Sequence, residues 1–221
     1  MDPSVEAART IMFLDLSRFT ALTDVHGDGT AVEVVDHFTS AVRLGVAGRG
    51  RVVKTMGDGV LLDMDGPSAA IEAAEAVSSA LHALPGMLDL TGGIATGPVI
   101  DHHGDVLGAT VNLASRLANL APAGELRVTA PAARAAAEGG WRVEPLGRVS
   151  IRGFHEPVNA FAVAFHRPPG GAVDVVCGMR ITPGPATPAL DREGSTWWFC
   201  SPRCRERFRR SPLPYLGEHE A

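Results

Sequence analysis

Apolar and polar positions along the first three quarters of the chain predict a fold that mixes strands and helices. Four short apolar runs have the length and composition of buried strands, at residues 10–16, 51–55, 60–64 and 88–95. Apolar residues recur at helical spacing in residues 30–46 and in an alanine-rich segment, residues 67–84. The Asp58-Gly59 pair predicts a hairpin turn between the second and third strands. This order of elements is typical of a ferredoxin-like α+β core.

The same patterns extend the first domain beyond this core. We expect a helix at residues 109–120 and four additional strands, at residues 97–100, 126–129, 143–151 and 158–165. The segment from Arg167 to Gly171 has the composition of a linker, and cysteine, tryptophan and arginine become common after it. We therefore predict a first domain at residues 1–166, a linker at 167–172, a small second domain at 173–216 and a tail at 217–221.

Composition and charge narrow the class of protein. The 221 residues are 45% hydrophobic, which supplies enough apolar surface for a buried core. A net charge of -5 disfavours a nucleic-acid partner, because nucleic-acid binders usually present a basic surface. No apolar stretch reaches the roughly 18 residues that a membrane helix requires, and no secretion signal opens the sequence. We therefore expect a cytoplasmic protein without a membrane or nucleic-acid partner.

Two aspartates are candidate site residues, and the first, Asp15, stands where a carboxylate is costly without a partner. Asp15 ends an apolar strand, and Asp58 lies at the tip of the predicted hairpin. Each also has a simpler interpretation, Asp15 as a helix N-cap and Asp58 as an ordinary turn residue. In the predicted core these strands are neighbours, so the two carboxylates can meet at one edge. The carboxylates suit divalent cations, and the N–H groups of the helix N-terminus that follows Asp15 suit phosphates. Together they suit phosphoryl transfer.

Three segments together resemble the signatures of class III nucleotidyl cyclases. They are Phe13 to Thr20 (FLDLSRFT), Lys54 to Gly59 (KTMGDG) and Gly104 to Arg116 (GDVLGATVNLASR). They occur in the family's order, and the resemblance covers residues 10–165, nearly all of the first domain. It implies the fold already predicted and a homodimer whose two active sites each combine residues of both chains.

The resemblance implies a role for each matching residue. Asp15 and Asp58 match the aspartates that bind two Mg²⁺ or Mn²⁺ ions. Lys54, the only lysine of the chain, and Asp105 match the pair that selects adenine. The ammonium would donate to a ring nitrogen and the carboxylate would accept from the exocyclic amine, whereas guanine presents the opposite pattern.

Other matching residues would bind the rest of ATP. Asn112 matches the residue that orients the ribose, and Arg116, on the same helical face, matches the arginine that stabilises phosphate charge in the transition state. Without the motif, both would be interpreted as solvated helix residues. Phe19 and Thr20 would lie at the helix N-terminus that binds phosphates. Arg152 stands where the family often has a phosphate-binding lysine.

One departure from the family's pattern is the short segment between the second and third signatures. It suggests a trimmed dimerisation arm. His102 and His103 lie there, either as ordinary surface residues or as groups that modulate a dimer near neutral pH.

The second domain resembles the YHS domain, a short module found in metal-handling and other proteins. The resemblance rests on Cys177-Gly178, Cys200 and Cys204 and on the aromatic pair Trp197-Trp198, which replaces the usual paired tyrosines. An odd number of cysteines without a secretion signal argues against a disulfide framework.

Three thiolates, from Cys177, Cys200 and Cys204, fit zinc or copper(I), but a tetrahedral site requires a fourth ligand. The second domain contains no histidine, so Asp174, His219 or a partner are the candidates for that ligand. The alternative is a small structural module with reduced thiols.

We therefore expect an adenylate cyclase, a phosphorus–oxygen lyase that converts ATP to 3′,5′-cyclic AMP and pyrophosphate for intracellular signalling. Two alternatives remain open. One is a catalytically silent cyclase-like module that senses nucleotide or metal, and the other is a guanylate cyclase.

Overall fold

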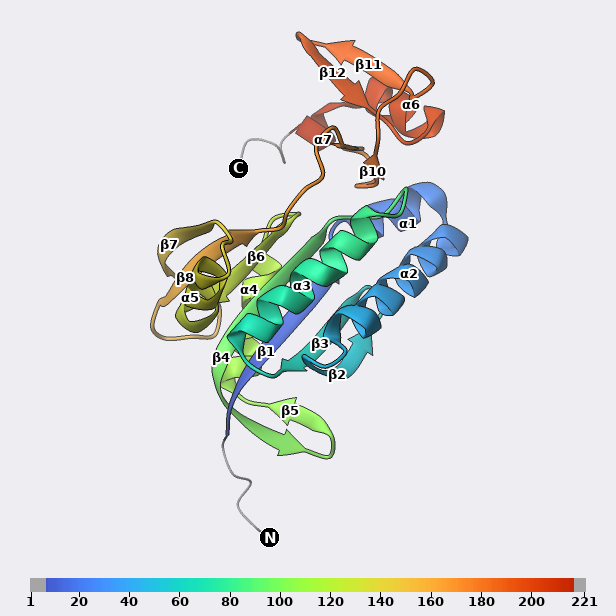
Figure 1. Cartoon of the computed structure of the whole chain (residues 1–221). Helices are drawn as coiled ribbons and strands as arrows, with labels where there is room; N and C mark the ends of the chain where they lie inside the picture. The colour runs from blue at the N-terminus through green and yellow to red at the C-terminus, as the bar shows by residue number, and fades with distance from the viewer. Residues whose placement is uncertain (1–6, 217–221) are drawn as a thin grey trace.

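The computed structural model describes residues 7–216, in which a small unit sits at one end of a sheet that carries helices on both faces (Figure 1). The strands of the large sheet are β1 (Ala7–Leu16), β2 (Gly50–Met56), β3 (Gly59–Met64), β4 (Leu90–His102), β5 (Asp105–Leu107), β6 (Glu125–Thr129), β7 (Val143–Val149) and β8 (Val158–Ala164). The helices around it are α1 (Phe19–His26), α2 (Asp28–Val46), α3 (Pro67–His82), α4 (Ala109–Leu120) and α5 (Ala130–Glu138).

The strand order across this eight-stranded sheet is β2-β3-β1-β4-β6-β8-β7, and β5 pairs with the far end of β4. β1 lies antiparallel to both β3 and β4, at the centre of the predicted core. β4 and β6 run parallel, which extends the core with later strands. The α+β fold with additional strands is therefore confirmed.

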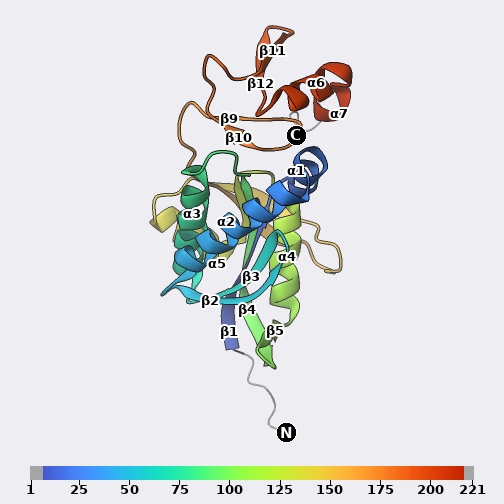
Figure 2. The same ribbon diagram turned by 90° about the vertical axis from the view of Figure 1, so that its right-hand side faces the viewer.

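Alternation along β1 separates the two faces of the sheet. Met12 and Leu14 face the helix layer of α2 and α3, where Phe38 is fully buried. Ile11 faces the opposite side, on which α4 packs. Asp15 has the same parity as Ile11, so the strand period directs its carboxylate to the α4 side. Figure 2 shows α2 and α3 on one side of the sheet and α4 on the other.

Close approach of α4 to the sheet depends on Gly93 in β4. A Cβ atom on Gly93 would lie 2.1 Å from the carbonyl oxygen of Ala114, so a side chain there would push the helix away. This glycine therefore sets the position of the helix that carries Asn112 and Arg116.

The second domain contains short elements around a small core. They are β9 (Ala172–Val173), β10 (Arg180–Ile181), β11 (Ala189–Arg192), β12 (Ser195–Trp198), α6 (Pro202–Arg210) and α7 (Leu213–Leu216). Phe199 and Phe208 fill its centre, with ring centroids 5.4 Å apart. Val25 of α1 is buried in the same core, so the first domain contributes a side chain to the interior of the second.

A buried carboxylate joins the two domains at their junction. Asp89 accepts hydrogen bonds from His82, from Arg167 of the linker and from Arg180 of the second domain, at 3.2, 3.1 and 2.9 Å. Burial would raise the pKa of Asp89, but the hydrogen bond to His82 and the two guanidinium groups hold it below its usual value. The paired charges make this contact specific in geometry.

Three elements differ from the prediction. Residues 90–95 and 97–100, predicted as parts of two strands, belong to one long strand, β4, because Thr96 and Gly97 continue the extended backbone. The helix α5 was not predicted, since its apolar positions are all alanines in a segment of only nine residues. The segment after Asp15 forms a complete helix, α1, which a single residue, Gly27, separates from α2.

Candidate functional site

Asp15 and Asp58 lie side by side at one end of the sheet. Asp15 is paired in register with Gly59, the residue that follows Asp58, and the backbone N–H of Leu16 donates to the carbonyl oxygen of Asp58 at 3.0 Å. A Cβ on Gly59 would lie 2.8 Å from Oδ1 of Asp15, so glycine keeps space for that carboxylate. The structure therefore brings together two residues that are far apart in the sequence.

The surroundings of Asp15 are unfavourable to its negative charge. Burial raises the pKa of Asp15 to about 6, and the charge of Asp58 contributes in the same direction, against a hydrogen bond from the Leu16 backbone. Two neighbouring carboxylates that repel each other form an environment that a cation stabilises. Oxygen donors of this kind suit Mg²⁺ or Mn²⁺.

An open cleft of about 490 Å³ extends from Asp15 between the end of β1 and α4. Ser17 and Arg18 line one side of it, and Ser115 and Asn119 of α4 line another. The carboxylate is therefore accessible to a ligand that approaches along the α4 face of the sheet.

Lys54 and Asp105 form an ion pair between β2 and β5, with Nζ 2.5 Å from Oδ2. The hydrogen bond from Lys54 lowers the pKa of Asp105, and a hydrogen bond from the Val106 backbone adds to this. Both side chains remain partly exposed, at 44% and 34%. The predicted purine-reading pair is therefore assembled within one chain and accessible from solvent.

The remaining predicted site residues are spread over the surface around this face. Asn112 and Arg116 are exposed on α4, and Arg152 is exposed in the loop between β7 and β8. Thr20 is exposed in the first turn of α1, whereas Phe19 packs partly against the core.

The cleft at Asp15 and the Lys54–Asp105 pair do not form one pocket in a single chain. Within residues 7–216, the side chains of Lys54, Asp105, Asn112 and Arg116 do not line that cleft. The apolar side chains of Met56 and Leu107 are 44% and 47% exposed. Met56 stands two residues after Lys54, and Leu107 stands two residues after Asp105. Each therefore lies on the same face of its strand as the site residue that precedes it. This face therefore combines polar site residues with uncovered apolar ones.

The three cysteines lie together where the second domain meets the first. The sulfur of Cys200 is 3.5 Å from that of Cys177 and 3.6 Å from that of Cys204. Hydrogen bonds from Cys177 and Cys200 lower the pKa of Cys204, which favours one thiolate in the cluster. The predicted thiol cluster therefore contains all three cysteines.

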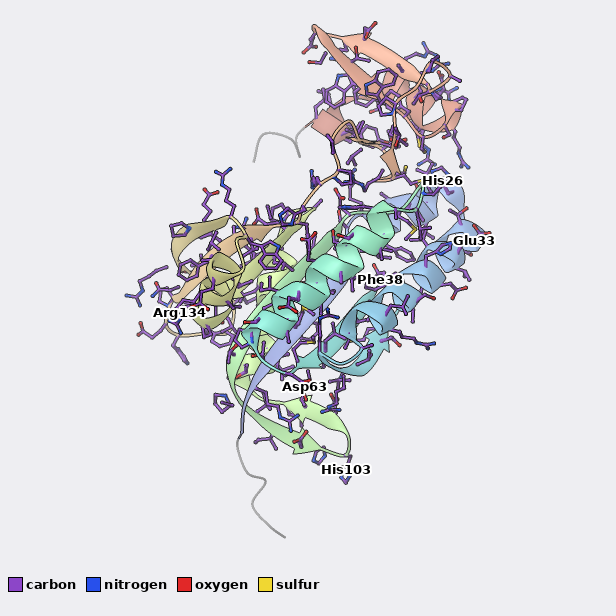
Figure 3. The ribbon with its side chains drawn as sticks, in the orientation of Figure 1. His26, Glu33, Phe38, Asp63, His103 and Arg134 are labelled. Carbon is purple, nitrogen blue, oxygen red and sulfur yellow. The ribbon has the colours of Figure 1, made fainter. Side chains whose placement is uncertain are left out.

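Sequence reasoning did not find His26, which lies beside these sulfurs at the end of α1 (Figure 3). No local pattern links His26 to the cysteines, which lie 151 to 178 positions later in the sequence. Of the predicted fourth ligands, Asp174 instead accepts hydrogen bonds from two backbone N–H groups, those of Val176 and Cys200. His219 lies outside the described residues.

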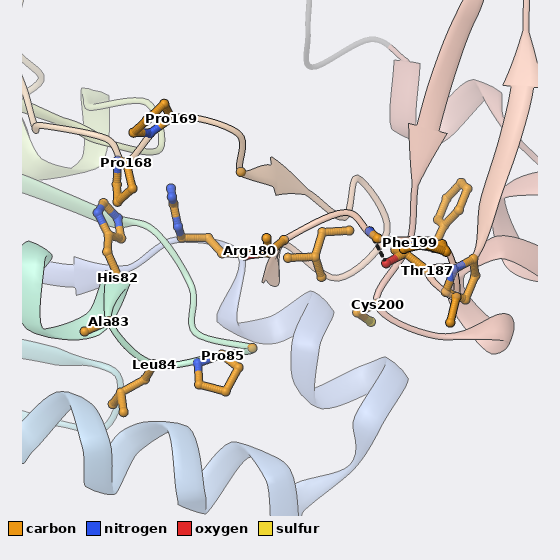
Figure 4. A pocket seen from close by; sticks show the side chains of 18 residues that line it. His82, Ala83, Leu84, Pro85, Pro168, Pro169, Arg180, Thr187, Phe199 and Cys200 are labelled. Carbon is orange, nitrogen blue, oxygen red and sulfur yellow. Dashed lines mark hydrogen bonds between the residues drawn. The ribbon is translucent and has the colours of Figure 1, made fainter.

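A larger cleft of about 730 Å³ separates the end of α3 from the second domain (Figure 4). His82 and Pro85 line the first-domain side, and Arg180, Thr187 and Cys200 line the other. No carboxylate of the described residues lines this cleft, so it does not offer the oxygen donors found at Asp15 and Asp58. Its relevance is that it opens the thiol cluster to solvent at Cys200.

Two families match the sequence, one for each part of the chain. The family described as the adenylate and guanylate cyclase catalytic domain matches residues 4–164. The family described as the YHS domain matches residues 172–219. Among residues 7–216, no helix has both the length and the apolar character needed to cross a membrane.

Individual relatives agree with the first match. An adenylate cyclase of Streptomyces coelicolor is 40% identical over 119 residues, which are 53% of this chain and 31% of the relative. This chain therefore corresponds to about a third of that protein's length.

Solved structures show the same fold at low identity. The adenylyl cyclase CyaB from P. aeruginosa has a TM-score of 0.65 and 20% identity, over 75% of this chain and 98% of that one. The guanylate cyclase domain of RhGC from Catenaria anguillulae, in complex with GTP, has a TM-score of 0.61 and 18% identity, over 75% of this chain and all of that one. The fold is thus common to cyclases of both purines.

Proposed function

We propose that this chain converts ATP to 3′,5′-cyclic AMP and pyrophosphate, since it belongs to the family of adenylate and guanylate cyclase catalytic domains. The observation that carries the proposal is that Asp15, which lines an open cleft, has Asp58 directly beside it. A turn residue or a helix cap alone does not require a second carboxylate beside it. A family member with this arrangement retains the means to bind divalent ions with a triphosphate.

In this mechanism Asp15 and Asp58 would hold two Mg²⁺ or Mn²⁺ ions, and the donor set fits these ions because it consists of adjacent carboxylate oxygens. When bound, the ions would lower the pKa of the ribose 3′-hydroxyl and offset charge on the leaving pyrophosphate. Asn112 holds the ribose so that its 3′-oxygen is in line with the α-phosphorus. Arg116 donates hydrogen bonds to the phosphate oxygens on which charge develops.

Two further places are proposed to bind the phosphates of the same substrate. The N-terminus of α1 offers the backbone N–H groups of Phe19 and Thr20, which no preceding helical turn satisfies. Arg152 supplies a second cation to the triphosphate from its exposed loop.

Adenine is the proposed base because of the Lys54–Asp105 pair. The lysine donates to a ring nitrogen of adenine, and the aspartate accepts from its exocyclic amine. Guanine has a carbonyl and a ring N–H in these positions, which leave Lys54 and Asp105 with mismatched partners. The Streptomyces coelicolor relative, named an adenylate cyclase, agrees with this assignment.

The active form is proposed to be a homodimer. Asp15 and Asp58 of one chain would face Lys54, Asp105 and the α4 residues of the other. The exposed Met56 and Leu107 support this, because a second copy would cover them. A twofold dimer of this kind contains two equivalent sites.

Product analysis tests the proposal directly. The full chain is incubated with Mn²⁺ or Mg²⁺ and either ATP or GTP, and cyclic nucleotides are quantified by mass spectrometry. We expect cyclic AMP, with kcat/KM for ATP at least about tenfold above that for GTP. Nucleotide binding without any cyclic product would instead indicate a silent sensing module, and a preference for GTP would indicate a guanylate cyclase.

A further inference from the structure

A second cluster of potential metal ligands lies between the two domains, away from the cleft at Asp15. Its members are His26 of α1 and Cys177, Cys200 and Cys204 of the second domain, whose ligand atoms all lie within 4.8 Å of one another. We propose that His26 and the three cysteines form one tetrahedral zinc site that joins the two domains. This goes beyond the proposed cyclase activity and does not depend on it.

The spacing of the ligand atoms fits one ion. The Nε2 atom of His26 is 3.4 Å from the sulfur of Cys200 and 3.9 Å from that of Cys204. A tetrahedron with zinc–sulfur bonds of about 2.3 Å has edges of about 3.8 Å, close to these separations. A disulfide would require sulfurs at about 2.05 Å, and all three cysteines are free. Ligands of a cluster with several irons would stand farther apart, because they bind different metal atoms.

The chemistry of the four donors also selects zinc. Three thiolates and one imidazole form a closed set that is typical of structural zinc sites. Hard ions such as Mg²⁺ prefer oxygen, which this cluster does not offer. Cys177 and Cys204 are buried, which is consistent with a closed, structural site.

Hydrogen bonds around the cluster hold the backbone of its ligands. The carboxylate of Asp174, itself fully buried, accepts from the backbone N–H of Val176 and of Cys200, both at 2.8 Å. Ser201 caps α6 by accepting from the backbone N–H of Cys204. Outer contacts of this kind commonly fix metal ligands, so the cysteine positions are set before an ion enters.

The docking of α1 brings the imidazole to the sulfurs. Asp24 pairs with Arg207 of α6, and the neighbouring Val25 is buried in the second-domain core. Arg18, just before α1, donates to the carbonyl oxygen of Val175 at 2.8 Å. Both ends of α1 are therefore anchored to the second domain, and His26 is the residue that α1 contributes to the cluster.

Zinc at this place would fix the end of the helix whose first turn follows Asp15. The ion has a route from solvent, since Cys200 also lines the larger cleft at the junction (Figure 4). The site would thus clamp the second domain onto the first by metal bonds as well as by packing.

The test begins with the wild-type full chain, purified without chelators. Elemental analysis is expected to give about one zinc per chain, and zinc X-ray absorption to give three sulfurs at about 2.3 Å and one imidazole nitrogen at about 2.0 Å. A chain that retains no metal, or that retains copper in place of zinc, would overturn the proposal. Neither measurement requires a variant.

Variants then identify the fourth ligand. In competition with a chromogenic chelator, His26→Ala is expected to bind zinc at least about tenfold more weakly, and His26→Cys to recover most of the affinity with a four-sulfur spectrum. His37→Ala, an exposed histidine on α2, is the matched control and should not change affinity. His219→Ala should not change it either. Unchanged affinity in His26→Ala, or a loss in His219→Ala instead, would contradict the assignment.

Discussion

The two candidate metal sites of this chain differ in donor chemistry and in completeness. Asp15 presents its carboxylate to an open cleft with Asp58 beside it, whereas His26 and three cysteines present one nitrogen and three sulfurs to one another. The first set leaves room for substrate oxygens and for a second chain. The second set already supplies four ligands from a single chain. An open, oxygen-lined site suits turnover, and a closed, sulfur-lined site suits structure.

Their positions differ in a second respect. The carboxylates meet through strand pairing inside one domain, but the complete set of His26 and three cysteines exists only while the two domains are docked. α1 connects them, because it begins after Asp15 and ends at His26. Four predictions test how far the two sites are independent.

The largest expected effect separates the two sites. Asp58→Asn should lower the rate of cyclic AMP formation at least about a hundredfold, because it removes the negative charge of a carboxylate that binds the ions, and the ions stabilise the transition state. Zinc content should stay at the wild-type value. Asp65→Asn, an exposed aspartate beyond the other end of β3, is the matched control and should retain activity. If Asp58→Asn also released zinc, the sites could not be treated as separate.

The next prediction tests whether each active site combines residues of two chains. Asp58→Asn and Arg116→Ala should each be nearly inactive, but an equal mixture that exchanges subunits should recover about a quarter of wild-type activity. Half of the dimers are then mixed, and each mixed dimer has one intact site of two. A mixture of Asp15→Asn with Asp58→Asn is the control, since both defects lie in the same half-site and no recovery is expected. Recovery there, or its absence in the first mixture, would contradict a site shared between chains.

The third prediction uses the titration of Asp15. Burial raises its pKa from 3.8 to about 6, so a proton competes with metal below that pH. Affinity for Mn²⁺, measured by calorimetry, should be nearly constant above pH 7 and fall about tenfold per pH unit below 6.

The same titration has the opposite effect on the metal-free protein. Proton uptake by folded Asp15 should stabilise it as the pH falls from about 6 towards 4, and Asp15→Asn should lack this contribution in urea unfolding. Affinity for Mn²⁺ that stays constant down to pH 5 would argue against Asp15 as a ligand.

The smallest expected effect tests the contact between α1 and the second domain. Gly178 has φ +82°, and an added Cβ would lie 2.9 Å from Cβ of Arg18. Gly178→Ala should therefore lower the free energy of unfolding by about 1–2 kcal/mol and speed zinc release. Gly194→Ala, with φ +81° but no atom within 4 Å of the added Cβ, carries the same backbone strain without the clash. Equal losses in the two variants would mean that this contact does not hold the domains.

Short-range patterns predicted much of the first domain. Strand and helix periods indicated β1, β2, β3, α2 and α3, because side-chain alternation and turn chemistry act within a few residues. The Asp58-Gly59 pair marked its hairpin for the same reason. Such patterns could not show that β4 continues through Gly97, or that the uniform alanines of α5 form a helix against the sheet.

The residue types of both clusters follow from the amino-acid sequence alone, namely the two aspartates in their motifs and the three cysteines near the end of the chain. What completes each arrangement follows only from the folding of the chain. Strand pairing places Asp15 against Gly59, and domain docking brings His26 to cysteines that lie about 150 or more positions later. No local pattern encodes the contact between His26 and the cysteines, because it depends on how the cores of two domains both pack against α1.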